Sequence, residues 1–273
     1  MRLIDNYDGL LLDLDGVVYR GSEAIPGAIE TINKLQGKLP IGYVTNNASR
    51  TQQQIAKQLS GYGITVEPSQ VISSAMAAAE MLKDMTSGKV LVIGGDGLRQ
   101  AVADQGFSLV ESSNEKPDAV IQGFSPEVGW KQLAEASYAI NNGAKWLATN
   151  QDWTIPLEKG IAPGNGTLVS AVHTAVGHLP DFAGKPSPKI FDTAKAQLGM
   201  SNPLVIGDRV DTDILGANNA GLDSALVFTG IARGKDAISA NKESRPRYLL
   251  ESVSEILEKY PEPKKTKYGY KTG

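Results

Sequence analysis

Four short clusters in the sequence combine residue types that could bind a metal ion or an anion. In chain order they are Asp13-Leu14-Asp15-Gly16, Thr45-Asn46-Asn47, Gly184-Lys185-Pro186, and the run from Gly207-Asp208 to Asp213. Three of the clusters directly follow an apolar run that is typical of a buried strand, and Lys185 stands just before a predicted helix. Open parallel sheets bind ligands beyond the carboxyl ends of their strands, so we expect the clusters to meet at one edge.

The acidic clusters are costly at the ends of buried strands unless a cation neutralises them. Asp13 and Asp15 offer hard oxygen ligands of the kind that Mg²⁺ prefers, and Gly16 lets the backbone turn sharply behind them. The segment 208–213 adds carboxylates that would repel the first pair if no metal were present. Either segment alone could cap a turn or a helix, but the two together favour a Mg²⁺ site.

The remaining two clusters could hold an anion. Lys185 supplies a point positive charge that suits a phosphate or a nucleophilic carboxylate. Thr45 and the backbone N–H groups of the turn after it could surround phosphate oxygens. Each cluster has an ordinary alternative, since a lysine before a proline is commonly a surface residue and Thr-Asn-Asn commonly ends a strand. The occurrence of all four clusters in this order along the chain is what favours phosphate chemistry.

Short apolar runs alternate with helical stretches along the chain, which predicts a doubly wound parallel α/β sheet of the Rossmann-like kind. We expect strands at 9–13, 41–47, 89–95, 118–124, 145–152, 203–208 and 224–229, a last strand and helix within 248–260, and helices at 27–36, 51–59, 73–85, 188–198 and near 211–220. Thr45 and Lys185 are 140 residues apart, much more than one crossover needs. We therefore expect an inserted α/β cap domain at 83–180, a core made of 1–82 and 181–273, and a flexible tail after about 262.

The composition excludes several classes of protein. The 273 residues carry 27 basic and 30 acidic side chains, so the net charge of −3 gives no electrostatic case for nucleic acid. The absence of cysteine excludes disulfides and thiolate catalysis. No segment approaches the ~18 apolar residues of a membrane-spanning helix, and the N-terminus does not have the pattern of a signal peptide. We expect a cytoplasmic protein that does not bind membranes.

The four clusters together resemble the haloacid dehalogenase-like phosphohydrolases, in particular the NagD-like branch with a large C2-type cap. That family has an Asp-x-Asp-Gly motif on its first strand, a Thr or Ser after the second, a lysine and a Gly-Asp-x4-Asp motif. Here these motifs correspond to Asp13 and Asp15, Thr45, Lys185, and Asp208 with Asp213. The resemblance covers roughly residues 8–230. It implies a magnesium-dependent phosphatase that hydrolyses a small phosphorylated metabolite through an aspartyl-phosphate.

The resemblance also implies a role for each matching residue. Asp13 would attack the phosphorus, and Asp15 would protonate the leaving oxygen and then accept a proton from water. Mg²⁺ would be held by the Asp13 carboxylate, the Asp15 main-chain carbonyl and Asp208, with Asp213 in the outer shell. The phosphoryl group would be bound by Thr45, Asn46, Asn47 and Lys185. An acid at position 15 fits phosphatases and phosphomutases and argues against dehalogenation.

The cap is expected to select the substrate, for which the family offers glycerol phosphate, phosphoglycolate, nucleoside monophosphates and pyridoxal phosphate. Related proteins often pair through their caps, so a homodimer is a further expectation. Within the cap, Asn150 and Asp152 either face the cleft or close a strand, and we favour the structural role. A phosphomutase or phosphotransferase would share the four motifs. A non-catalytic nucleotide-binding protein would explain Gly95-x-Gly97, but not both acids near Asp13 or Lys185.

Overall fold

A computed structural model describes residues 2–157 and 159–259. The tail after about residue 262, which we expected to be flexible, lies outside the described residues. The chain divides into two compact units. The first comprises Met1–Val44, Ala56–Ile72 and Lys185–Gly273, and the second comprises Thr45–Ile55 and Ser73–Gly184. Each unit has its own parallel sheet.

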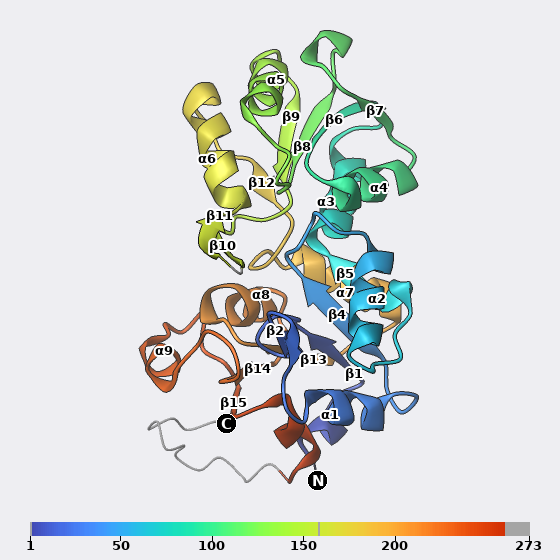
Figure 1. The fold of residues 1–273 in the computed structure, drawn as a ribbon, viewed down its shortest axis with the longest axis vertical. Helices are drawn as coiled ribbons and strands as arrows, with labels where there is room; N and C mark the ends of the chain where they lie inside the picture. The colour runs from blue at the N-terminus through green and yellow to red at the C-terminus, as the bar shows by residue number, and fades with distance from the viewer. Residues whose placement is uncertain (1, 158, 260–273) are drawn as a thin grey trace. The chain divides into compact units, whose positions relative to one another are not determined.

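The first unit is built on a six-stranded sheet in the order β15-β14-β13-β1-β4-β5 (Figure 1). Its strands are β1 (Gly9–Leu12), β4 (Ile41–Thr45), β5 (Val71–Ser73), β13 (Pro203–Gly207), β14 (Ser224–Val227) and β15 (Tyr248–Leu250). β1 pairs in parallel with β13 on one side and β4 on the other. Every residue of β1 is buried, as the uninterrupted apolar run predicts for a strand covered on both faces.

The helices of this unit follow from amphipathic spacing. In α1 (Ala28–Leu35) the buried residues are Ala28, Thr31, Ile32 and Leu35, which recur at three- and four-residue intervals. The other helical elements are α7 (Lys189–Leu198), α8 (Leu215–Asn219), α9 (Gly234–Ser239), a π-helical turn (Val210–Ile214), and 3₁₀ turns at Leu3–Asn6, Pro68–Gln70 and Val253–Leu257. α2 (Gln52–Gly61) begins in the segment grouped with the second unit. A short antiparallel hairpin joins β2 (Tyr19–Arg20) to β3 (Glu23–Ala24).

The second unit has a five-stranded sheet in the order β12-β9-β8-β6-β7 (Figure 1). Its pairs are parallel throughout, and its strands are β6 (Lys89–Ile93), β7 (Ser108–Val110), β8 (Ala119–Gln122), β9 (Lys145–Ala148) and β12 (Asp181–Phe182). The helices are α3 (Ser74–Met85), α4 (Asp96–Asp104), α5 (Trp130–Asn141) and α6 (Asn165–Val176), with a 3₁₀ turn at Ser113–Glu115. β10 (Thr154–Leu157) and β11 (Gly160–Pro163) form an antiparallel hairpin. Apolar side chains of α5 and α6 share one core with Trp146.

The parallel, helix-flanked sheets confirm the predicted fold class, with differences at element ends. β4 ends at Thr45, two residues before the expected end of that strand, because side-chain hydrogen bonds organise the next residues into a turn. The helix expected near 211–220 begins as the π-helical turn, and the expected last helix is a 3₁₀ turn. α3 continues without a break through position 82, where we expected the core to give way to the cap.

Candidate active site

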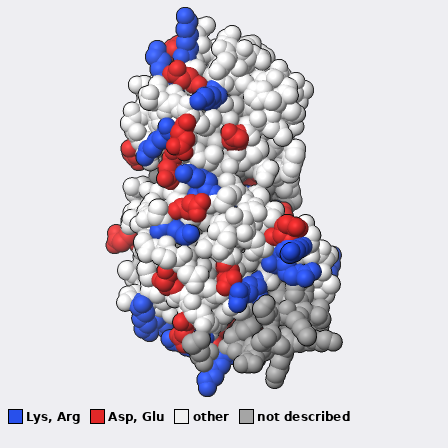
Figure 2. Space-filling model, turned by 180° about the vertical axis from the view of Figure 1, so that it is seen from behind, with Lys and Arg blue, Asp and Glu red and all other residues white. Residues whose placement is uncertain are grey.

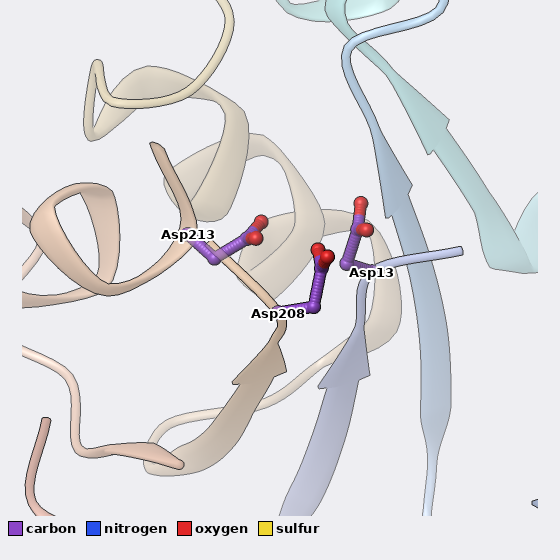
Figure 3. Close-up of side chains that lie close together, drawn as sticks. All are labelled: Asp13, Asp208 and Asp213. Carbon is purple, nitrogen blue, oxygen red and sulfur yellow. The ribbon is translucent and has the colours of Figure 1, made fainter. Parts of the chain in front are cut away.

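The tips of two neighbouring strands bring Asp13 and Asp208 together. β1 and β13 run in register, with Leu12 opposite Ile206, and the Asp13 amide donates to the Ile206 carbonyl at 2.9 Å. Each aspartate therefore lies just beyond the end of its strand. Figure 3 shows both carboxylates at these strand ends, with Asp213 directed toward them from the helical turn Val210–Ile214 that follows β13. Carboxylate oxygens of all three residues lie within 4.8 Å of one another.

The π-helical turn aims Asp213 at the other two acids. The amides of Asp213 and Ile214 both donate to the Arg209 carbonyl, at 3.1 and 3.2 Å, which widens the first turn after the strand. Asp213 Oδ2 accepts from the Arg209 amide at 3.1 Å. Asp211 lies two residues earlier and forms an ion pair with Arg209 at 2.7 Å, with most of its side chain exposed. The turn thus buries Asp213 and leaves Asp211 at the surface.

Lys185 lies between two of the buried acids. Its Nζ donates to Asp13 Oδ1 at 2.5 Å and to Asp213 Oδ1 at 2.6 Å, and it lies 3.3 Å from the Val44 carbonyl of β4. Only 3% of the residue is exposed. Burial alone lowers the pKa of Lys185, but the charges of Asp13 and Asp213 raise it overall, so the ammonium stays charged. Lys185 therefore fixes the orientation of the Asp13 carboxylate.

The three acids exceed the positive charge available to them. One ammonium against three carboxylates leaves two negative charges in a buried place. Burial, together with the neighbouring carboxylates, raises the pKa of Asp13 well above its usual range and that of Asp208 to about 7. Within residues 2–157 and 159–259, no hydrogen bond reaches Asp13 Oδ2 or Asp208 Oδ1. Two open, anionic oxygens with an excess of two charges fit a divalent cation with a preference for oxygen ligands.

Glycines at three positions allow this close packing. A Cβ at Gly230 would lie 1.9 Å from Asp208 Oδ2, and one at Gly207 would lie 2.1 Å from the Asp213 Cβ. Gly16 has a φ of +88°, and its Cβ would lie 2.5 Å from Asp208 Oδ2. No side chain can occupy these positions without displacing an acid. Glycine backbone therefore packs directly against Asp208 and Asp213.

Asp15 lies two residues after Asp13, in the loop that follows β1, and is more exposed than Asp13. Partial burial raises the pKa of Asp15, while an N–H of Gly21 and the charge of Arg20 oppose that shift. A raised pKa increases the protonated fraction near neutral pH, which suits a proton donor. In the described part of the chain, the Asp15 main-chain carbonyl accepts no hydrogen bond.

The Thr45-Asn46-Asn47 cluster forms a tightly bonded turn. The Asn47 amide donates to Thr45 Oγ1 at 3.1 Å, and Asn47 Oδ1 accepts from the amides of Ser49 and Arg50. Asn46 Nδ2 donates to both carboxylate oxygens of Asp152, at 3.2 and 3.1 Å. The Asn47 side-chain oxygen thus shapes the turn. The structure groups Asp13, Lys185, Asp208 and Asp213 in the first unit and places this turn in the segment assigned to the second.

Asn150 joins several backbone segments of the second unit. Its Nδ2 donates to the Asn46 carbonyl at 2.8 Å, its Oδ1 accepts from the Asp152 amide, and its carbonyl accepts from Asn165 Nδ2. Only 4% of the residue is exposed. These bonds describe a residue that closes a strand.

The Gly95-x-Gly97 turn is also a packing device. A Cβ at Gly97 would lie 2.3 Å from the Arg50 carbonyl, and the Gly97 amide donates to the Ser49 carbonyl at 3.1 Å. The glycines therefore let α4 contact the 48–50 loop closely.

One component of the site has no counterpart among the predicted residues. The segment 229–233, after β14, contacts both the Asp13–Gly16 loop and Asp208. Ile231 donates its amide to Asp208 Oδ2 at 2.6 Å, and Thr229 Oγ1 donates to the Gly16 carbonyl at 2.6 Å. The contacts to Asp208 use the backbone amides of this segment, which nearly every residue type has. The only sequence signal is Gly230 directly after a predicted strand.

Charged side chains of both signs lie interspersed on the face of the described residues that Figure 2 draws. Among the described helices, none has both the length and the apolar content needed to cross a membrane. The buried Lys185 is the clearest candidate for a positive charge that could face a phosphate.

Comparison with known proteins identifies the family. A family model described as haloacid dehalogenase-like hydrolase matches residues 10–108, and a HAD-hydrolase-like model matches residues 182–256. The D-glycerol 3-phosphate phosphatase of Mycobacterium tuberculosis is 40% identical over 269 residues, which are 96% of this chain and 76% of that protein. The acid sugar phosphatase of Staphylococcus saprophyticus is 37% identical over 256 residues, covering 92% of this chain and 97% of that one.

A solved structure extends the similarity to three dimensions. The crystal structure of the glycerol phosphate phosphatase from Mycobacterium tuberculosis in complex with magnesium matches with a TM-score of 0.91 at 40% identity. The match covers 95% of this chain and 79% of the other. The similarity therefore spans both sheets as well as the acidic motifs.

Proposed function

The chain belongs to the haloacid dehalogenase-like hydrolases, and we propose that it is a magnesium-dependent phosphatase of small phosphorylated metabolites whose nucleophile is Asp13. The observation that carries this proposal is the buried group of three carboxylates around one lysine. Asp13 Oδ1 is bonded to Lys185, while its Oδ2 remains open among the described residues. A carboxylate held in one orientation with a free oxygen has the arrangement that a nucleophile needs.

The reaction proceeds in two displacements. In the first, a carboxylate oxygen of Asp13 forms a bond to the phosphorus as the bond to the substrate oxygen breaks, and Asp15 donates a proton to that oxygen. In the second, Asp15 takes a proton from water, the water oxygen attacks the phosphorus, and the aspartyl–oxygen bond to phosphorus breaks. Inorganic phosphate leaves, and Asp13 and Asp15 regain their starting forms. The raised pKa of Asp15 supports both of its roles.

The remaining residues hold the ion and the phosphoryl group. Asp13, Asp208 and the Asp15 carbonyl would hold Mg²⁺, which supplies positive charge to the phosphoryl oxygens. Both Asp213 oxygens already accept hydrogen bonds, from Lys185 and Arg209, which supports an outer-shell role. Lys185 would add positive charge to the phosphoryl group. The resemblance assigns phosphate contacts also to Thr45, Asn46 and Asn47; the position of Thr45 as the last residue of β4, the strand next to β1, supports its assignment.

A polyol or sugar phosphate is the substrate class that we propose. Two of the similar proteins are named D-glycerol 3-phosphate phosphatase and acid sugar phosphatase. Phosphoglycolate, nucleoside monophosphates and pyridoxal phosphate are the other members of the test panel. We propose further that the inserted segment, expected at 83–180, acts as a cap that selects among these substrates. Pairing of two copies through this segment, and a cytoplasmic location, remain predictions.

Phosphate release from this panel tests the proposal. We expect release from one or a few compounds with Mg²⁺, and none when excess chelator replaces the metal. Asp13→Asn keeps the shape of the side chain but removes the nucleophile, so kcat is expected to fall by at least about 10³-fold. The matched control is Asp211→Asn, which changes an exposed acid of the neighbouring motif.

Three results would contradict parts of the proposal. Near-native turnover by Asp13→Asn would show that another group is the nucleophile. Transfer of the phosphoryl group to a second position on the substrate, without free phosphate, would identify a phosphomutase. A folded protein that binds Mg²⁺ but turns over no member of the panel would exclude the proposed substrate class.

A further inference from the structure

The segment from Thr229 to Arg233 makes hydrogen bonds to two loops that are distant in sequence. On one side, Thr229 Oγ1 donates to the Gly16 carbonyl at 2.6 Å, and Arg20 donates to the Thr229 carbonyl. On the other side, Ile231 donates to Asp208 Oδ2 at 2.6 Å, and Ala232 donates to the Asp208 carbonyl at 3.1 Å. The segment therefore links the loop after the proposed nucleophile to the proposed metal ligand.

Arg233 holds this segment in its curved form. Its Nη1 lies 2.7 Å from the Gly230 carbonyl, 3.1 Å from the Ile231 carbonyl and 2.9 Å from the Ala232 carbonyl. One guanidinium thus draws three consecutive carbonyls to one side, so the opposite side of the backbone presents its amides. Those are the amides that reach Asp208. Ala232 is buried and anchors the segment in an apolar cluster with Ile214 and Leu226.

The contact with Asp208 is as close as backbone allows. A Cβ at position 230 would meet Asp208 Oδ2 at 1.9 Å, and a Cβ at position 16 would come within 2.9 Å of the Gly230 Cα. The two glycines bring two pieces of backbone, the loop at Gly16 and the segment at Gly230, against one carboxylate. Asp208 Oδ2 is occupied by the Ile231 amide, which leaves Oδ1 as the oxygen directed at the metal.

We propose that residues 229–233 form a clasp that orients Asp208 for Mg²⁺ and holds it in register with the Asp13–Gly16 loop. Thr229 and Arg233 are positioning residues, since neither needs to touch the ion or the substrate. The inference rests on the proposed role of Asp208 as a metal ligand. Partners that orient metal ligands commonly change metal affinity by about 10- to 100-fold when removed. The effect of the clasp should therefore appear first in the binding constant for Mg²⁺.

Thr229→Val tests the clasp, because it keeps the side-chain shape but removes the hydroxyl that reaches Gly16. Calorimetric titration with Mg²⁺ alone is expected to show a dissociation constant about tenfold above wild type. Thr229→Ser restores the hydroxyl and should stay within about twofold of wild type. At saturating Mg²⁺, the KM of Thr229→Val for its substrate should be unchanged, since the substitution acts on the ion.

Two further variants make the result specific. Thr31→Val removes a similar hydroxyl bond, from Thr31 Oγ1 to the Gly27 carbonyl at 2.7 Å, away from the site, and should leave Mg²⁺ binding unchanged. Arg233→Met releases the three carbonyls and should weaken Mg²⁺ binding without any change at Thr229. Wild-type Mg²⁺ affinity in both Thr229→Val and Arg233→Met would overturn the clasp. Wild-type Mg²⁺ affinity in Asp208→Asn would instead overturn the metal site itself, so the two failures are distinguishable.

Discussion

The two sheets of this protein share an architecture and differ in the residues just beyond the carboxyl ends of their strands. Both are parallel and flanked by helices. At the carboxyl ends of β1 and β13 the first sheet places two acids, Asp13, which is mostly covered, and Asp208, which is buried. At the end of β9 the second sheet places Thr149 and Asn150, which are neutral and bonded to nearby backbone.

This difference shows where function resides in such a fold. Neutral polar groups at a strand end can form hydrogen bonds with one another, and Asn150 takes part in four such bonds with neighbouring segments and Thr149. Three carboxylates with one ammonium cannot, since an excess of negative charge remains. The parallel sheet provides the position, and uncompensated charge provides the chemistry. Substitutions in either sheet, and a change of pH, test whether the two strand ends differ in this way.

Removing the buried ammonium should have the largest effect. Lys185→Met leaves Asp13 and Asp213 buried without their cation, which should lower the free energy of unfolding by about 3 kcal/mol at neutral pH. Turnover should fall by at least about 100-fold, because the charge that stabilises the phosphoryl group is lost. Urea denaturation in chelator and steady-state kinetics measure the two effects. The control in the second sheet is Lys145→Met, an exposed lysine, which should change stability by about 0.5 kcal/mol or less.

A stability of Lys185→Met equal to that of Lys145→Met would contradict the contrast. It would mean that the acids of the first sheet are compensated by something other than this lysine.

The metal-free protein should lose stability as the pH rises. Burial, with the charge of Asp213, raises the pKa of Asp208 from 3.8 to about 7, so the folded chain holds a proton that the unfolded chain has released between these values. This contribution is full below about pH 4 and is lost as pH approaches 7, at about 1.4 kcal/mol per pH unit. The pKa of Asp13 is also raised, so its ionisation should lower the stability of the metal-free protein as well. Thermal unfolding in chelator from pH 5 to 7 measures the loss.

Saturating Mg²⁺ should abolish that loss, because the ion binds the ionised carboxylates and stabilises the folded state. In Asp208→Asn the slope in chelator should be smaller than in wild type. An unchanged slope in this variant would assign the pH dependence to other groups.

The smallest effect is expected in the second sheet. Asn150→Ala removes the side-chain bonds to the Asn46 carbonyl and from the Asp152 amide, which should lower the free energy of unfolding by about 1 to 3 kcal/mol. Mg²⁺ affinity should not change, since the role is structural. Asn141→Ala, at the exposed end of α5, is the matched control and should be nearly neutral. A large loss of Mg²⁺ affinity in Asn150→Ala would contradict the separation of the two roles.

Much of this arrangement could be predicted from the sequence because it depends on side-chain type and strand order. The apolar run before Asp13 predicts a buried strand, and a second run before Asp208 predicts another. Parallel pairing then brings their following residues to one edge. Lys185 is brought to the same edge by the loop before α7, which the predicted helix at 188–198 anticipates. The family of the chain, the fold class and the expected need for Mg²⁺ follow from these few positions.

The remainder depends on backbone geometry that residue types do not reveal. The clasp acts through amides and carbonyls, so Ile231 and Ala232 give no chemical signal. The hairpins β2–β3 and β10–β11 have strands of two and four residues, too short for a clear alternation. The π-helical turn that aims Asp213 differs from an ordinary helix by one hydrogen bond, from the Ile214 amide to the Arg209 carbonyl.

The central position of β1 in its sheet has a consequence for folding during synthesis on the ribosome. Its partner on one side, β4, begins 29 residues after β1 ends, whereas its partner on the other side, β13, begins only at Pro203. While the intervening chain is being made, one edge of an apolar strand has no native neighbour. The newly made chain therefore cannot assemble its two proposed ion-binding strand ends until most of its length has emerged. The proposed active site is therefore completed only late in synthesis.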